Sequence, residues 1–517
     1  MATPEKRATQ RPRRRTGRAT HPDTSGPGSR GVAAFLCIAL IAAAGGVGGT
    51  AKASGTTGAR SAGPSADLSR ATGGSGVFVG QTITVNLKRA GYVEREYVAS
   101  GDATSYTATV PLAGDGRWSF VEDGRAPYRT RVLVRRPGEP ARFSGTVVVE
   151  WLNVTTGVDV NLEFSTAHEE ILRRGDAWVG VSAQRVGVEG GPAELKVPDG
   201  FPGSEDAGQG LKAVDPGRYG SLVHPGDGFA FDIFTQVVRA LRSGAGMAGL
   251  RPRRIIAAGI SGSANALVTY YNGVQPLTQA FDGFFVHGRG GAPFPLVGPG
   301  EYAGIANAIG GTPTTFRADQ DAPVLVVQTE SEIEGVLNSY VARQPDSDRF
   351  RLWEVAGTAH VDEHLLASYA QDFDCSVPIN NGPLHVVAKA GLRALTKWIE
   401  MGKAPPQAPR IEVAAGASPQ TQRDDDGIAL GGIRTPPVDV PVAALSGAPG
   451  ANPSMLCLFS GSTNPIPEER LAQLYPSRAV YRQRYDRGAK AAIKAGFVLP
   501  EDRAALFAFA EPSRIQR

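Results

Sequence analysis

The sequence predicts an α/β fold, namely a doubly wound and mostly parallel sheet with antiparallel strands before it. Three observations support this. A chain of 517 residues can bury a large core. Near-continuous Val/Ile runs alternate with helical segments, a pattern typical of strands that are buried on both faces of a parallel sheet. One such run passes through a sharp Gly/Ser turn, "AAGISGSA" (257–264), directly into a helix.

Seven apolar runs after residue 128 predict the strands of this sheet. They are "RVLVRR" (131–136), "GTVVVEWL" (145–152), "AWVGVSAQ" (177–184), "RIIAAGI" (254–260), "FDGFFVHG" (281–288), "APVLVVQT" (322–329) and "FRLWEVAG" (350–357). "NLEFSTAHEEILRRG" (161–175) predicts a helix that ends at a glycine. Between residues 77 and 128, alternating runs such as "TITVNL" (82–87) and "SYTATVPL" (105–112) predict antiparallel strands.

The N-terminal segment predicts export. "RPRRRTGR" (11–18), the apolar "VAAFLCIALIAAA" (32–44) and "AKA" (51–53) form the three parts of a signal peptide over residues 1–53. Glycines directly after residue 44 interrupt the apolar stretch, which favours cleavage over the alternative of a retained membrane anchor. We therefore expect a secreted or cell-envelope protein with no stable membrane span. Residues 54–76, rich in Gly, Ser and Ala, predict a flexible linker.

The net charge and the cysteines bear on the class of partner and on disulfide formation. Residues 1–53 hold nine of the 54 Lys/Arg and two of the 50 Asp/Glu, so the remainder, with 45 basic and 48 acidic residues, has a net charge of −3. This balance argues against a nucleic-acid partner. After signal cleavage, Cys375 and Cys457 remain. In an oxidising compartment we expect them to form a disulfide, and the alternative is a pair of buried free thiols.

The turn at Ser261 has the features of a nucleophile elbow. A strand that turns sharply into a helix projects the serine hydroxyl above the sheet, and the positions two before and two after it must be small. Gly259 and Ser263 meet this requirement, although Ser263 departs from the usual glycine. The amide of Gly262 then faces the place where an oxyanion would form. The alternative is an ordinary Gly/Ser turn before a helix.

A candidate acid and base follow Ser261 in the order that such a triad requires. The strand "PVLVVQ" is followed by "TESE", which offers Glu332 or, alternatively, Glu330. The next strand is followed by "GTAHVDEH", in which His360 lies in a loop before a helix. The other histidines precede the acid or lie in or beyond that helix. We predict Ser261 as nucleophile, His360 as base and Glu332 as the acid that orients it.

Several blocks of sequence resemble a large family of exported α/β-hydrolase-domain proteins. They are "VEWLNV" (149–154), "DPGRYGSLVHPGD" (215–227), "GISGS" (259–263), "DGFFVHGRG" (282–290), "QTESE" (328–332) and "WEVAGTAHVD" (353–362). The resemblance covers most of residues 77–510, which we treat as one domain. It implies a hydrolase, with esterase-like activity, and leaves the substrate open.

The resemblance also implies a second oxyanion donor in the loop after "VVVEWL", at Asn153 or Val154. "NVT" (153–155) is alternatively a glycosylation sequon or a turn without a role. Residues 186–227 form a long Gly/Pro-rich segment that predicts a lid-like insertion. We expect Arg185, Tyr219, His224 and Arg289 to shape the substrate pocket, unless Arg289 pairs with acids of the protein itself. Residues 451–510 predict a C-terminal helical cover.

These features together predict an exported serine hydrolase that acts on carboxylic esters through an acyl-enzyme. The expected partner is a small-molecule or polymeric ester, with no cofactor and no metal, and the oligomeric state stays open. A non-catalytic binding protein on the same fold is the first alternative, because Ser263 breaks the strict motif. A metal-dependent hydrolase is the second, with "HVDEH" (360–364) as its only candidate ligand cluster.

Overall fold

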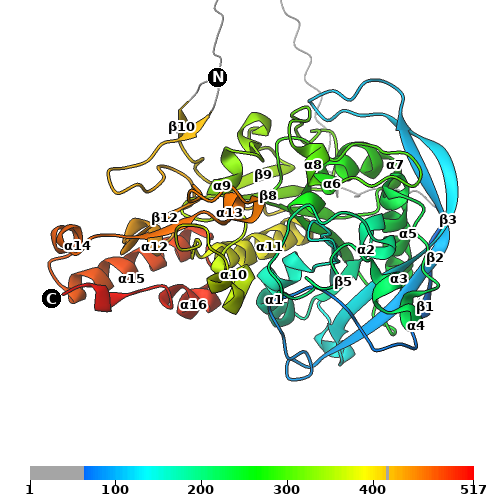
Figure 1. Ribbon diagram of the computed structural model, residues 1–517, viewed down its shortest axis with the longest axis horizontal. Helices are drawn as coiled ribbons and strands as arrows, with labels where there is room; N and C mark the ends of the chain where they lie inside the picture. The colour runs from blue at the N-terminus through cyan, green and yellow to red at the C-terminus, as the bar shows by residue number, and fades with distance from the viewer. Residues whose placement is uncertain (1–62, 415–418, 517) are drawn as a thin grey trace, which may run out of the picture. The chain divides into compact units, whose positions relative to one another are not determined.

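A nine-stranded sheet organises the chain in the computed structural model, which describes residues 63–414 and 419–516. The strand order is β1-β2-β3-β5-β4-β6-β7-β8-β9. Helices cover both faces of the sheet (Figure 1). The predicted signal peptide and the first part of the predicted linker lie outside the described residues. Among the described residues, no helix combines the length and the apolar character that crossing a membrane requires.

The parallel part of the sheet confirms the doubly wound prediction. Strands β4 to β9 run parallel in the order β5-β4-β6-β7-β8-β9, and their side chains are almost all buried. Each corresponds to one of the predicted apolar runs. Their bounds are β4 Thr146–Trp151, β5 Ala177–Val181, β6 Arg254–Ile260, β7 Gly283–His287, β8 Val324–Thr329 and β9 Phe350–Val355.

The antiparallel part differs from the prediction in two places. A long hairpin, β2 Tyr92–Ala108 and β3 Phe120–Pro137, joins β5, and β1 Asp67–Arg70 pairs with β2 at the edge. The flexible linker predicted over residues 54–76 is therefore wrong at β1, because backbone pairing with β2 compensates for the few apolar side chains there. "TITVNL" (82–87) is not a strand, since its Val85 and Leu87 pack onto the core while Thr82 donates a hydrogen bond to the carbonyl of Leu365.

Two helical layers cover the sheet. On one face α5 (Ala230–Ser243) and α6 (Gly262–Thr269) pack their apolar side chains against the strands. On the other face lie α1 (Leu162–Arg174) and α11 (Leu384–Met401). Helix α1 ends at Gly175 in the left-handed conformation, as the sequence predicts. Shorter helices lie between and beyond these layers: α2 Arg185–Glu189, α3 Leu211–Val214, α4 Pro216–Tyr219, α7 Gln275–Thr278, α8 Ile305–Ala308, α9 Glu330–Ile333 and α10 Glu363–Leu366.

The topological switch point of the sheet lies between β4 and β6. From β4 the chain crosses to β5 on one side, and from β5 it returns to β6 on the other side of β4. In open α/β sheets, ligands bind beyond the carboxyl ends of the strands at such a point. The loop that begins at Asn153 and the turn at Ser261 follow these two strands, so the fold brings both to this crevice.

The C-terminal segment adds a small helical layer next to β9 (Figure 1). It consists of α12 Pro436–Asp439, the pair β12 Ala443–Ser446 and β13 Ser462–Pro465, α13 Met455–Ser460, α14 Glu468–Leu474, α15 Arg478–Ala495 and α16 Arg503–Phe507. A second short pair, β10 Val413–Ala414 and β11 Gln420–Thr421, precedes it. A disulfide joins Cys375 to Cys457 of α13, with an S–S distance of 1.99 Å.

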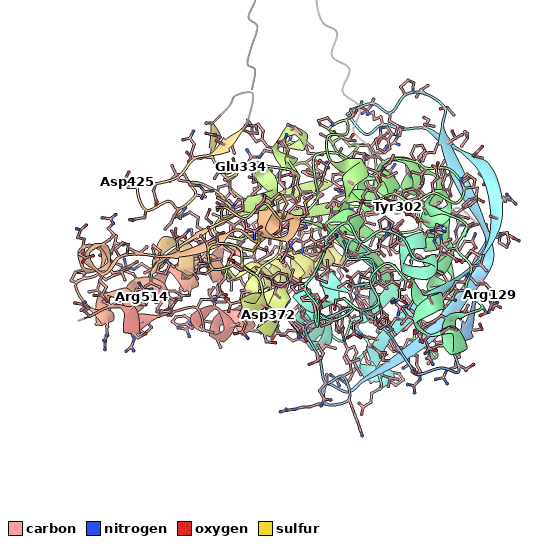
Figure 2. The ribbon with its side chains drawn as sticks, viewed as in Figure 1. Arg129, Tyr302, Glu334, Asp372, Asp425 and Arg514 are labelled. Atoms are coloured by element: carbon pink, nitrogen blue, oxygen red, sulfur yellow. A yellow bond between two sulfur atoms is a disulfide. The ribbon has the colours of Figure 1, made fainter. Side chains whose placement is uncertain are left out.

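Exposed acids such as Asp372 and Asp425 lie at the periphery (Figure 2).

Three histidines meet where α1, α10 and α11 pack together. The rings of His364 and His385 stack with centroids 3.8 Å apart, and Lys389 nearby pairs with Glu169. Burial, together with the nearby His168 and Lys389, lowers the pKa of His364 to about 4, and burial lowers the pKa of His385 well below its ordinary value. Both imidazoles are therefore neutral in the folded protein at pH values where they are protonated in the unfolded chain.

This pair makes stability depend on pH in a defined direction. Between the ordinary histidine pKa and the lowered folded values, the unfolded state binds more protons, so acidification favours unfolding. We expect replacement of both His364 and His385 by Phe to reduce the loss of Tm between about pH 7.5 and about pH 5. Thermal unfolding of both proteins at each pH measures this. Buried Asp362, with its pKa raised to about 7, acts in the opposite sense in both proteins. An equal loss of Tm would contradict the assignment.

Candidate active site

Ser261 occupies a strained turn between β6 and α6. Its φ and ψ are 62° and −124°, a region that non-glycine residues seldom adopt. Its amide donates a 3.0 Å hydrogen bond to the carbonyl of His287 at the end of β7. Gly259 is required here because a Cβ at that position would lie 3.0 Å from the Cβ of Ser263. The local structure is that of a nucleophile elbow.

Ser263 fits the elbow although it is not glycine. The side chain is fully buried, and its hydroxyl oxygen has no hydrogen-bond partner within the described part of the chain. Because the serine side chain is small, the backbone of Gly259 can still pass close to Ser263. The departure from the strict motif therefore preserves the turn and adds one unsatisfied buried hydroxyl.

His360 and Glu332 form a buried imidazole–carboxylate pair. His360 Nδ1 lies 2.6 Å from Glu332 Oε1, and both side chains are buried. The carboxylate is fixed from the other side, since it also accepts hydrogen bonds from the hydroxyl of Thr329 at 2.7 Å and from the Thr329 amide. The Ser331 hydroxyl accepts the backbone N–H of His360 at 2.8 Å, which fixes the loop. Because Nδ1 is engaged by Glu332, Nε2 is the ring nitrogen that can exchange a proton with a neighbouring hydroxyl.

Glu330 lies in a different environment from Glu332. Its carboxylate accepts the amides of Gly357 and Gly447, each at 2.9 Å, and forms an ion pair with Arg423 at 2.5 Å. These contacts tie α9 to the C-terminal segment. Of the two acids that the sequence offers, the structure therefore pairs Glu332 with His360.

The backbone at Gly288 passes close to this pair. A Cβ at position 288 would lie 2.9 Å from His360 Nδ1 and 3.3 Å from Glu332 Oε1, and the φ of Gly288 is 61°. The residue before it, His287, accepts the amide of Ser261. The end of β7 therefore contacts all three candidate residues, so Gly288 belongs to the site although the sequence analysis did not select it.

The predicted oxyanion donors differ in which of their N–H groups are already engaged. The Asn153 amide donates to the carbonyl of Val160 at 3.0 Å, and its side-chain nitrogen donates to the carbonyl of Ile260 at 3.1 Å. Asn153 therefore ties its loop to the elbow: its backbone N–H is engaged, while its side-chain amide lines the cavity and keeps a second N–H. In the described part of the chain, the amides of Gly262 and Val154 have no backbone acceptor. The buried Thr156 hydroxyl also has no hydrogen-bond partner among the described residues, and Thr156 lines the cavity that is described next.

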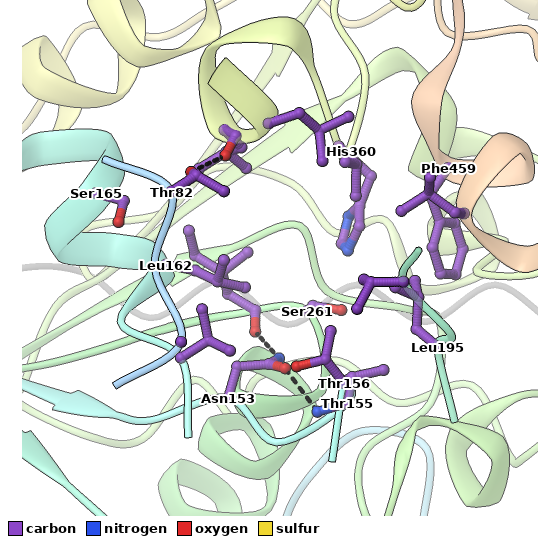
Figure 3. Close-up of a pocket in the computed structure, with 18 of the residues that line it drawn as sticks. Thr82, Asn153, Thr155, Thr156, Leu162, Ser165, Leu195, Ser261, His360 and Phe459 are labelled. Carbon is purple, nitrogen blue, oxygen red and sulfur yellow. Dashed lines mark hydrogen bonds between the residues drawn. The ribbon is translucent and has the colours of Figure 1, made fainter. Parts of the chain in front are cut away.

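A cavity opens beside Ser261 and His360. Figure 3 shows the imidazole on one side of the Ser261 hydroxyl and Asn153, Thr155 and Thr156 on the other. The described residues show no hydrogen bond between Ser261 Oγ and His360, and such bonds often tighten only in the substrate complex. The wall is mostly apolar. It includes Val160, Leu162, Leu195, Val197, Phe201, Ile260, Val361, Leu365, Leu366, Leu456 and Phe459.

The four predicted pocket residues are not among those lining this cavity. Tyr219 donates to Glu96 at 2.7 Å in a buried ion-pair network, and His224 Nε2 bonds the carbonyl of Ala183 at 2.8 Å. Arg185 donates to the carbonyl of Gly190 at 3.0 Å. Arg289 is buried and donates to backbone carbonyls, and this burial lowers its pKa to about 9. The assignments were wrong because none of the four side chains lines the cavity, and each bonds instead to groups of the protein itself.

The predicted insertion 186–227 and the predicted C-terminal cover both contribute to the wall. Leu195, Val197 and Phe201 come from the first, and Leu456 and Phe459 from the second. The Phe459 ring packs on the imidazole of His360 with centroids 5.0 Å apart. Sequence reasoning missed these side chains, since no local pattern distinguishes a wall-lining Leu or Phe from one in the core.

The second histidine of "HVDEH" lies away from His360. His364 stacks on His385, whereas His360 pairs with Glu332. Among the described residues, no group of three or more His, Cys, Asp or Glu side chains is arranged to hold a metal ion.

One comparison with known proteins, the match to a family model, agrees with the architecture. The family model described as "Alpha/beta hydrolase domain" matches residues 61–508. Similar solved structures include a putative dienelactone hydrolase from Klebsiella pneumoniae, with 13% identity, 59% of this chain and 99% of that chain covered, and a TM-score of 0.29. A serine hydrolase without a lid from Xanthomonas campestris shows 12% identity, coverage of 56% and 94%, and a TM-score of 0.29. No curated protein matches the chain.

The unsatisfied hydroxyl of Ser263 generates a stability prediction. Ser263→Ala removes a buried polar group without a partner and improves helix propensity at the start of α6. We expect the free energy of unfolding to rise by about 1 kcal/mol. Urea unfolding of the variant and the wild type measures this. Ser263→Val is the control, because added volume against Gly259 should destabilise the protein. A less stable Ser263→Ala would show that the hydroxyl has a partner.

Proposed function

This chain belongs to the α/β-hydrolase domain family, and we propose that it is a serine hydrolase that cleaves carboxylic esters. One observation carries the proposal. A buried carboxylate–imidazole pair, Glu332 and His360, adjoins the same cavity as a serine held in a strained elbow. Backbone strain of this kind costs free energy and is often found at functional sites.

The proposed reaction proceeds through an acyl-enzyme. His360 Nε2 takes the proton of the Ser261 hydroxyl as Oγ attacks the acyl carbon, and the carbonyl oxygen becomes an oxyanion. His360 then gives this proton to the departing alcohol as the bond to the acyl carbon breaks. A water attacks the acyl-enzyme with His360 again as the base, which releases the carboxylic acid and regenerates Ser261. Glu332 holds the imidazole in the required tautomer and stabilises its protonated form.

The oxyanion is stabilised at the start of α6. The Gly262 amide belongs to the first turn of this helix, where N–H groups are free and the dipole favours negative charge. The second donor comes from the loop after β4, where the Val154 amide and the Thr156 hydroxyl have no acceptor in the described part of the chain. Preorganised donors of this kind are usually the largest electrostatic contribution to acyl transfer.

Export belongs to the same proposal. The basic and apolar N-terminal segment with "AKA" (51–53) has the pattern of a signal peptide, and a disulfide between Cys375 and Cys457 suits an oxidising compartment. Release of a mature chain beginning at Ser54 into the medium or cell envelope is the expected result of expression. N-terminal sequencing of that chain tests it, and an uncleaved N-terminus would support the alternative of a membrane anchor.

The nucleophile assignment has a direct test. Ser261→Ala should lower kcat on short-chain aryl esters by a factor on the order of 10⁶, because nucleophile and base act as a unit. It should also abolish labelling by a fluorophosphonate probe. Unchanged turnover by the variant would contradict the assignment. If the folded wild type shows no turnover and no labelling, the result would favour the non-catalytic binding protein.

The acid assignment is tested by a matched pair of variants. Glu332→Gln keeps the shape of the side chain but removes the charge that orients His360, and we expect kcat to fall by about 10³ to 10⁴. Glu330→Gln should leave kcat within a few-fold of the wild type and lower Tm, since it weakens the contacts with Arg423 and Gly357. Steady-state kinetics and thermal unfolding of both variants distinguish the two acids. The opposite pattern would identify Glu330 as the acid.

A further inference from the structure

We propose that the substrates are esters with an uncharged, apolar acyl group, and that this group occupies the cavity beside Ser261. The inference rests on the proposed function, because it assumes an acyl-enzyme at Ser261. It concerns the composition of the cavity wall, which the catalytic assignment does not use.

The cavity wall carries no charge. Among the described residues that line it, none is Asp, Glu, Lys or Arg. The polar side chains Thr82 and Ser165 lie towards one side, and Asn153, Thr155 and Thr156 lie near the elbow (Figure 3). An ionised carboxylate or ammonium in such a site loses its hydration without gaining a counter-ion. Substrates with a charged acyl chain are therefore disfavoured.

Part of the apolar wall belongs to two small buried clusters. Leu195, Leu456 and Phe459 belong to one buried cluster, and Leu366 belongs to a second cluster around the disulfide. A methylene group that enters this space leaves water for an apolar surrounding. By the usual value for burying one methylene, each added carbon that fits should raise kcat/KM about fourfold.

The wall is held in place by covalent and backbone contacts. The Cys375–Cys457 disulfide anchors α13 directly beside Leu456. The Val361 amide, next to His360, donates to the carbonyl of Phe459 at 3.0 Å. Since α13 is fixed at both points, the wall should limit chain length instead of adapting to longer chains.

We assign the acyl group, and not the alcohol, to this cavity because of the order of the two steps of the acyl-enzyme reaction. The alcohol leaves after the first step, whereas the acyl group stays bonded to Ser261 until water attacks. An apolar cavity bounded by the elbow, the base and Phe459 suits the group that remains. The cavity volume is about 90 Å³, which suits a short acyl chain and not a long one.

The test compares acyl chains on one leaving group. The mature protein is assayed with p-nitrophenyl acetate, butyrate, hexanoate and decanoate, and with the p-nitrophenyl monoester of adipic acid, whose chain matches hexanoate but ends in a carboxylate. We expect kcat/KM to rise to hexanoate, to fall for decanoate, and to be about 100-fold lower for the monoadipate than for hexanoate. An alcohol series of acetate esters should show no comparable dependence on chain length.

Variants of α13 tie the preference to the wall. Leu456→Phe fills the cavity and should lower kcat/KM for hexanoate at least about tenfold relative to acetate. Leu458→Phe is the matched control, because Leu458 lies on the same helix but is not among the lining residues. It should keep the wild-type profile. Should Leu456→Phe fail to fold, Leu456→Ala, which enlarges the cavity, should move the optimum to longer chains.

The outcomes separate this inference from the proposed function. Labelling of Ser261 by a fluorophosphonate, with the monoadipate cleaved as fast as hexanoate, would overturn the inference and leave the serine hydrolase intact. A chain-length dependence confined to the alcohol series, or a profile that Leu458→Phe changes as much as Leu456→Phe, would also overturn it. Absence of labelling in folded wild-type protein would refute the proposed function and with it the inference.

Discussion

The left-handed turn at Ser261 is the constraint on which the rest of the site depends. A non-glycine residue at a φ of 62° is stable only if its surroundings hold it, and here both flanks are fixed. Buried strand β6 precedes the turn and α6 follows it, while the Ser261 amide is bonded to the end of β7. The parallel sheet therefore supplies the rigidity, and its switch point supplies the crevice.

The end of β7 connects this turn to the base and the acid. Gly288 has no side chain, so its backbone can lie against the hydrogen bond between His360 and Glu332. Arg289, whose guanidinium donates to the carbonyls of Gly290, Gly291 and Thr314, fixes the turn that follows. Arg289, which the sequence predicted to bind substrate, therefore has a structural role. Its buried guanidinium is bound by main-chain carbonyls and not by an acidic side chain.

Sequence patterns predicted the parallel strands, the elbow and the pairing of Cys375 with Cys457, but they did not predict the cavity. Strands and elbow are local, because apolar runs and small residues at fixed spacing have few alternatives. The choice between Glu330 and Glu332 depended on which carboxylate faces His360, and residues two apart cannot be separated by pattern alone. The wall joins α10, α13 and residues 195–201, which only tertiary packing brings together. Tyr219 was misassigned because its hydrogen-bond partner, Glu96, lies far away in the sequence.

We propose that Ser261, His360 and the Gly262 amide act on one acyl group whose chain lies in the apolar cavity. A crystal structure of the mature protein after reaction with an alkyl fluorophosphonate is the decisive test. We expect a covalent bond to Ser261 Oγ, a phosphonyl oxygen within hydrogen-bond distance of the Gly262 amide, and the alkyl chain between Leu195, Leu456 and Phe459. An adduct on another residue, or an alkyl chain directed away from this cavity, would contradict it.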